Sequence, residues 1–153
     1  MGLDERLSEL GIELPPAPQP VASYLPVVVS GGFAFVAGQI AREADGTLIH
    51  PGQVGADVDV PRAQQAARIC ALQALSALRA ELGGFDRLVR IVKVEVFVAS
   101  APGFTDQPSV ANGASDLFAE VLGAAGTHAR AAVGVVALPL GASVELTLIA
   151  EVS

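Results

Sequence analysis

The chain has 153 residues, the length of one ordinary domain, and 52% of them are hydrophobic while only 16% are charged. Nine Lys and Arg against 16 Asp and Glu leave a net charge of -7, and aromatic residues make up 5%. Nucleic-acid binders need basic surface to displace counterions and often aromatic side chains for stacking, so we expect no nucleic-acid partner. With so little charge, part of the surface has to be apolar, and a second copy of the chain commonly covers such surface.

Cys70 is the single cysteine, so the chain can form neither an internal disulfide nor a thiolate metal cluster. The mixed charges of Asp4, Glu5 and Arg6 do not fit a signal peptide. The uncharged stretch 14–41 holds too many Pro and Gly residues for a membrane helix. We therefore expect a cytoplasmic protein that does not associate with a membrane.

The first 23 residues are expected to form a short helix and an extended arm outside the main domain. Leu3, Leu7 and Leu10 recur at helical spacing. The segment 14–20 is rich in proline, which suits neither a helix nor a central strand. The main domain is placed at residues 24–153.

The main domain is predicted to be α+β, with the element order β-β-α-β-α-β-β. Gly31-Gly32 indicates a hairpin turn between two β-rich runs. Asp59 and Pro61 are typical of a helix start, and Gly83-Gly84 ends that helix. The predicted strands are 27–30, 33–40, 90–100, 131–138 and 143–152, the predicted helices are 61–82 and 108–122, and 50–59 is a loop. This order predicts a mixed sheet with both helices on one face.

Alternation in two strands predicts which side chains face the helices. The buried face is expected to carry Val92, Val94, Val96, Val98, Val144, Leu146, Leu148 and Ala150. The opposite face is expected to carry Lys93, Glu95, Glu145, Thr147, Ile149 and Glu151. Because the chain carries little charge, we expect a neighbouring subunit to cover this second face.

Histidine and cysteine give weak functional signals. A metal site would have to join His50 and His128 with carboxylates from unrelated segments, so surface imidazoles are the favoured interpretation. Cys70 lies on the apolar stripe of the first long helix and is expected to be a buried small hydrophobic residue.

Arg130 is the most informative charged residue, because the segment 131–144 that follows it has no charge. A guanidinium beside an apolar strand must reach solvent or find an anion. Glu145 is the next charged residue and could approach Arg130 if their strands pair. A structural ion pair is the favoured interpretation from the residues alone. The alternative is a site in which Arg130 holds a substrate carboxylate and Glu145 handles water.

Three segments carry a resemblance to a known family: Gly32–Ile40, Val92–Val98, and the spacing from Arg130 through Leu138-Pro139 to Glu145. From about Tyr24 onward, the chain resembles the YjgF/YER057c/UK114 (Rid) family. The resemblance implies a chorismate-mutase-like α+β fold and a homotrimer with active sites in clefts between subunits. It also implies hydrolysis of amino-acid enamines and imines to 2-keto acids and ammonia, without a metal or organic cofactor.

The resemblance also implies roles for individual residues. Arg130 would bind the substrate carboxylate, and Glu145 would position or activate the attacking water. The remaining residues implied at the cleft are Tyr24, Gly38, Asn112 and, through its backbone, Ala132.

Departures from the family pattern place the chain in a divergent branch. The family's deaminases usually carry Ser-Gln after the tyrosine, where this chain has Leu25-Pro26. Ala37 replaces a small hydroxyl residue, and Ala132 stands where Cys is frequent.

Two other functions stay open. The same cleft could bind a small carboxylate-bearing metabolite without turnover. An endoribonuclease activity is a further alternative, against which the acidic charge balance argues.

Overall fold

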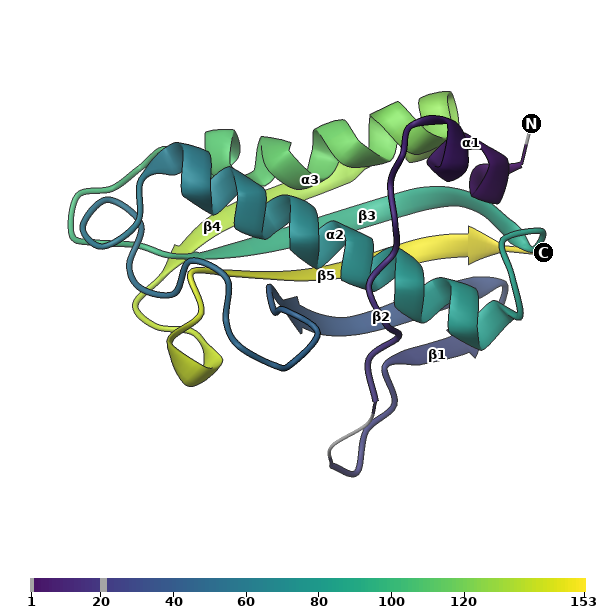
Figure 1. The fold of residues 1–153 in the computed structure, drawn as a ribbon, viewed down its shortest axis with the longest axis horizontal. Helices are drawn as coiled ribbons and strands as arrows, with labels where there is room; N and C mark the ends of the chain where they lie inside the picture. The colour runs from purple at the N-terminus through teal and green to yellow at the C-terminus, as the bar shows by residue number, and fades with distance from the viewer. Residues whose placement is uncertain (1, 20–21) are drawn as a thin grey trace.

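The structure, a computed structural model, describes residues 2–19 and 22–153. The sheet has five strands, and the long helices lie on one face of it (Figure 1). The elements are α1 (Leu3–Glu9), β1 (Val27–Ser30), β2 (Phe33–Ile40), α2 (Val60–Leu82), β3 (Leu88–Ala99), α3 (Gln107–Leu122), β4 (Ala129–Val135) and β5 (Val144–Val152). Two short 3-10 turns, η1 (Gly123–Gly126) and η2 (Pro139–Gly141), flank β4. The predicted α+β class and element order are confirmed.

The strand order in the sheet is β1-β2-β5-β3-β4. β3 and β4 run parallel, and every other neighbouring pair is antiparallel, so the sheet is mixed as predicted. β5 inserts between β2 and β3, and α3 carries the chain across to the edge strand β4 (Figure 1). As a result β4 and β5, which follow one another in the sequence, are separated by β3.

The start and end of α2 follow the signals in the sequence. The Asp59 side chain accepts a hydrogen bond from the backbone N–H of Arg62 at 3.0 Å, and Pro61 lies in the first turn. Gly83 ends the helix in the left-handed conformation, with φ of 73°, which costs a glycine little. The buried face of α2 includes Cys70, which is fully buried as predicted.

The N-terminal segment lies against the domain. Leu3 and Leu7 of α1 are buried in the core, and residues 14–19 form neither a helix nor a strand, as predicted; Pro20 lies outside the described residues. The Ser76 hydroxyl donates to the Pro15 carbonyl at 2.6 Å, and this bond fixes the arm across α2. The domain boundary at residue 24 stays a prediction.

One strand face differs from the prediction. The register of β3 against β5 shifts between Ile91 and Lys93, so Val92 is an extra residue in the ladder. Ile91 is fully buried while Val92 is only half-buried, and the placement of Val92 on the buried face was wrong. Val94, Val96 and Val98 face the helices as predicted.

The sheet face away from the helices is uncovered in a single chain. It carries the predicted polar residues, among them Lys93 and Glu95, which form an ion pair at 2.8 Å. Apolar side chains on this face stay 40–46% exposed: Val28, Phe33, Phe35 and Val133. This mixture is unusual for a face that meets only water. Among the described residues, no helix is long and apolar enough to cross a membrane.

The close approach of α2 and α3 gives a stability prediction. A Cβ on Gly113 would overlap the backbone carbonyl of Gln64 in α2. Gly113→Ala should therefore lower the free energy of unfolding by about 1–3 kcal/mol, although alanine is the better helix former. Gly2→Ala is the control, because a Cβ there would meet nothing within 4 Å. Chemical denaturation measures the free energy of unfolding of both variants. An unchanged or raised stability for Gly113→Ala would contradict the close packing of α2 against α3.

Candidate functional site

All the predicted site residues except Ala132 fall into two groups. The Arg130 cluster contains Arg130, Asn112 and Ser115, which accept hydrogen bonds from it, and His128, which bonds to Ser115. The Glu145 cluster contains Glu145, Gly38 and Tyr24, which lie around one end of β2. The structure brings Arg130 to Asn112 and Glu145 to Gly38, but it does not bring the two clusters together.

In the Arg130 cluster, one nitrogen of the guanidinium is held by two neutral acceptors. Nη1 of Arg130 donates to Oδ1 of Asn112 at 2.7 Å and to Oγ of Ser115 at 3.2 Å. Asn112 and Ser115 lie one turn apart on α3, so they present their side chains on the same side of the helix. Nε and Nη2 of Arg130 donate to no residue of 2–19 or 22–153. This free edge has the two-donor geometry that matches a carboxylate.

His128 extends the cluster into the protein. Its Nδ1 lies 2.6 Å from the Gly126 carbonyl, which can only accept, so Nδ1 carries the proton. Its Nε2 lies 2.9 Å from Oγ of Ser115 and, in the neutral ring, accepts the hydroxyl proton. The ring also meets Phe118 edge to face, with centroids 5.7 Å apart. The interpretation of His128 as a surface imidazole was therefore wrong, because the ring is half-buried and engaged at both nitrogens.

Ala132 lies on the same edge strand and the same sheet face as Arg130, two residues further along β4. It packs against the core opposite Val96 and is half-buried. Its implied role in binding stays a prediction.

In the Glu145 cluster, a β-bulge brings backbone and carboxylate together. The register of β2 against β5 shifts between Val36 and Gln39, and Gly38 lies inside this shift. A Cβ at Gly38 would overlap the Glu145 carboxylate, so the position requires a glycine as long as Glu145 keeps its place. Burial raises the pKa of Glu145 above its ordinary value.

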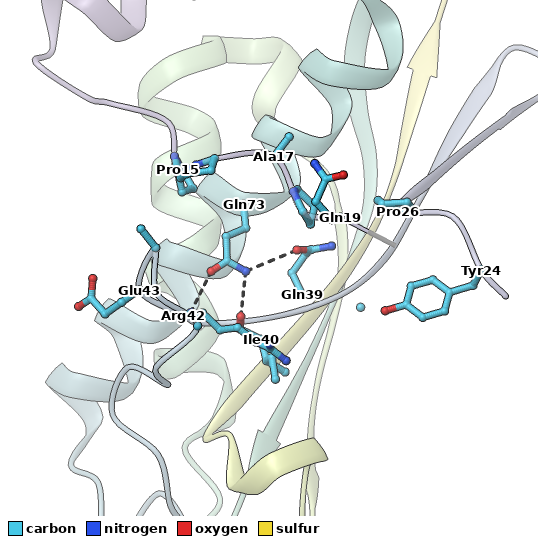
Figure 2. Close-up of a pocket in the computed structure, with 15 residues that line it drawn as sticks. Pro15, Ala17, Gln19, Tyr24, Pro26, Gln39, Ile40, Arg42, Glu43 and Gln73 are labelled. Carbon is cyan, nitrogen blue, oxygen red and sulfur yellow. Dashed lines mark hydrogen bonds between the residues drawn. The ribbon is translucent and has the colours of Figure 1, made fainter. Parts of the chain in front are cut away.

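Tyr24 borders a cavity of about 400 Å³ next to this bulge. The proline arm and the end of β2 form its walls, and Figure 2 shows the Tyr24 hydroxyl pointing into it, toward the side where Gln39 lies. The Pro26 carbonyl accepts from the Ala37 N–H at 2.9 Å, which ties the chain after Tyr24 to the bulge. Tyr24 itself is 50% exposed.

Two buried glutamines that the sequence analysis missed hold the end of β2. Gln73 of α2 accepts from the Arg42 N–H at 2.9 Å and donates to the Ile40 carbonyl at 2.8 Å (Figure 2). It also reaches Oε1 of Gln39 at 3.4 Å. Both side chains are less than 10% exposed. The available signal was a polar residue within the apolar stretch 69–75 of the helix.

Arg130 and Glu145 do not form the ion pair that the residues alone favoured. Arg130 lies opposite Val94 and points to the helix-covered face, while Glu145 lies opposite Phe97 and points to the uncovered face. β3 lies between their strands. The strand pairing on which the ion pair depended is not made, and within one chain the two side chains are on opposite sides of the sheet.

The described residues contain no group of three or more His, Cys, Asp or Glu side chains that could hold a metal ion. His50 contacts Gln65 at 2.8 Å, and Cys70 is buried against the Val144 carbonyl. Neither residue lies in the two clusters.

Comparison with known proteins assigns the family. The sequence profile described as "YjgF/chorismate_mutase-like, putative endoribonuclease" matches residues 4–152. The chain belongs to this family. Protein TCP17 of Trypanosoma cruzi is 48% identical over 148 residues, which cover 96% of this chain and 92% of that protein.

Two solved structures extend the comparison. Atu1372 from Agrobacterium tumefaciens, of unknown function, is 45% identical with a TM-score of 0.90, covering 99% of this chain and 94% of that one. TdcF from E. coli, solved with bound serine, is 25% identical with a TM-score of 0.64, covering 90% of this chain and 94% of that one.

The raised pKa of Glu145 predicts a pH dependence of stability. Between the unfolded and folded pKa values the native state binds more protons than the unfolded state, so stability falls as pH rises through that window. Glu145→Gln removes the ionised group and should be more stable than the wild type near neutral pH. The difference in the free energy of unfolding between the variant and the wild type should close as pH falls below the pKa of Glu145 in the unfolded state, near 4.5. Chemical denaturation of both proteins from pH 4 to pH 8 measures this difference. A difference that widens toward acid pH would contradict the raised pKa of Glu145.

Proposed function

We propose that the protein is a hydrolase that deaminates small enamine and imine intermediates of amino-acid metabolism to 2-keto acids and ammonia. The observation that carries the proposal is the guanidinium of Arg130, which is held by neutral acceptors while its Nε–Nη2 edge is open. A substrate carboxylate would bind that edge through two parallel charge-assisted hydrogen bonds. Serine, the molecule bound in the TdcF structure, bears such a carboxylate.

The proposed site needs a second copy of the chain. Arg130 and Glu145 point to opposite faces, so one carboxylate-bearing small molecule cannot lie between both in a single chain. The uncovered face of the sheet is apolar enough to be buried against another subunit. We therefore infer a homotrimer in which the Arg130 cluster of one subunit meets the Glu145 cluster of the next.

The chemistry follows from these groups. The enamine tautomerises to the imine, whose C2 carbon is electrophilic. The imine takes up a proton from solvent, and the ionised carboxylate of Glu145 accepts a proton from water as the water oxygen bonds to C2, which gives a neutral carbinolamine. The carboxylic acid then returns that proton to the amine. As the C2–N bond breaks and the C=O bond forms, the carbinol hydroxyl gives its proton to the carboxylate, which releases it to solvent, and ammonia and the 2-keto acid leave. A carboxylate with a raised pKa suits both steps better than a fully solvated one.

No step requires a metal or organic cofactor, because the substrate is already electrophilic and needs mainly orientation and proton transfer. A cytoplasmic location is part of the proposal, since the only thiol, Cys70, is a buried free cysteine. The same cleft without turnover would make the protein a binding module for small carboxylates. The family description also names an endoribonuclease, but the net charge of -7 opposes RNA binding.

The role of Arg130 is tested by ammonia release from 2-aminoacrylate generated in the assay, and from bulkier amino-acid imines. The wild type should exceed the spontaneous rate, and Arg130→Ala should lose about 10- to 100-fold in kcat/KM, the range for a lost charge-assisted contact. Arg79→Ala is the control, because Arg79 is exposed and, among the residues that the structure describes, forms an ion pair only with Asp4, at 3.0 Å. A wild type that accelerates none of these imines would contradict the deaminase proposal, and 2-keto acid binding without turnover would favour the binding module.

Gly38→Ala tests the contact between the bulge and the carboxylate. The added methyl group should displace the flexible Glu145 side chain, so activity should fall as far as in Glu145→Ala with little change in the melting temperature. The two changes should not add, because both remove the same placed carboxylate. Rates of the two single variants and the double variant measure this. Full additivity would show that Gly38 acts independently of Glu145.

A further inference from the structure

We propose that Ser115 and His128 are positioning residues that hold Arg130 so that its Nε–Nη2 edge faces the substrate carboxylate. The inference rests on the proposed function, in which Arg130 binds that carboxylate. Ser115 and His128 would not touch the substrate; they act through the guanidinium.

The hydrogen bonds are all donated in one direction, from Arg130 toward the protein backbone. Nδ1 of His128 donates to the Gly126 carbonyl at 2.6 Å, which leaves Nε2 as an acceptor for the Ser115 hydroxyl proton at 2.9 Å. With its proton directed to His128, Oγ of Ser115 turns a lone pair to Nη1 of Arg130 at 3.2 Å. Each of these three donors, on His128, Ser115 and Nη1 of Arg130, therefore meets an acceptor.

The His128 end of this chain is anchored in the core. Gly126 is buried, and a Cβ on it would overlap the backbone carbonyl of Phe118, so the turn η1 is pressed against α3. Phe118 is fully buried and meets the His128 ring edge to face at 88°. The imidazole is thus fixed by packing as well as by hydrogen bonds.

Arg130 needs such an anchor because it lies exposed on an edge strand. An arginine side chain loses rotamer freedom when it binds a ligand, and holding Nη1 beforehand reduces that loss. Both anchors, Asn112 and Ser115, are uncharged, so they orient the guanidinium without neutralising it. The full positive charge stays available to the substrate.

The experiment compares wild type, Ser115→Ala and His128→Phe with the conservative control Ser115→Thr, which keeps a hydroxyl. The first measurement is rotation of the Arg130 guanidinium about its Nε–Cζ bond by NMR, without ligand. The second is the Kd for pyruvate as a probe 2-keto acid, with KM and kcat for 2-aminoacrylate. His128→Phe keeps an aromatic ring against Phe118 while removing the acceptor.

Ser115→Ala and His128→Phe should speed the guanidinium rotation and raise Kd and KM several-fold, with kcat much less affected. Ser115→Thr should behave like the wild type. Rotation and Kd unchanged in Ser115→Ala would overturn the positioning role, and so would equal losses in Ser115→Ala and Ser115→Thr. A third outcome separates the two proposals. If the wild type binds no pyruvate and hydrolyses no imine, but the guanidinium rotates faster in Ser115→Ala, then Ser115 does position Arg130 and the proposed function is overturned.

Discussion

The position of β3 between β5 and β4 determines on which face of the sheet the Arg130 and Glu145 side chains lie. Side chains alternate along each strand, so the register of β4 and β5 against β3 sends Arg130 and Glu145 to opposite faces of the sheet. The helices then cover the face of Arg130, while the face of Glu145 stays open and partly apolar. One chain therefore holds two incomplete halves of the proposed site, and a second copy would complete it.

Close backbone contacts give each half its shape. On the Arg130 side, Gly113 lets α3 approach α2, and Gly126 lets the following turn press on α3. Those contacts fix the helix that carries Asn112 and Ser115. On the Glu145 side, Gly38 makes room for the carboxylate. In both halves a glycine is needed because neighbouring atoms occupy the space of a side chain.

Much of the fold was predictable because local signals agree with it. The apolar stripe of α2, with Asp59 before it and Gly83 after it, predicted that helix nearly to the residue. Features that depend on strand pairing were not predictable. The bulge at Val92 adds one residue without changing the apolar pattern, and nothing in the sequence shows that β3 separates β4 from β5, which follow one another in the chain. The hydrogen bond between His128 and Ser115 arises only when α3 packs against the segment that leads into β4.

The central claim, that each site is built from two subunits, is tested most directly by mixing two inactive variants. Arg130→Ala and Glu145→Gln would be purified separately, then unfolded and refolded together in equal amounts, and ammonia release from 2-aminoacrylate measured. Random assembly leaves about a quarter of the sites with both groups intact, so the mixture should recover about a quarter of the wild-type activity. A mixture no more active than either variant alone, under conditions where refolded wild type regains its activity, would contradict the shared site.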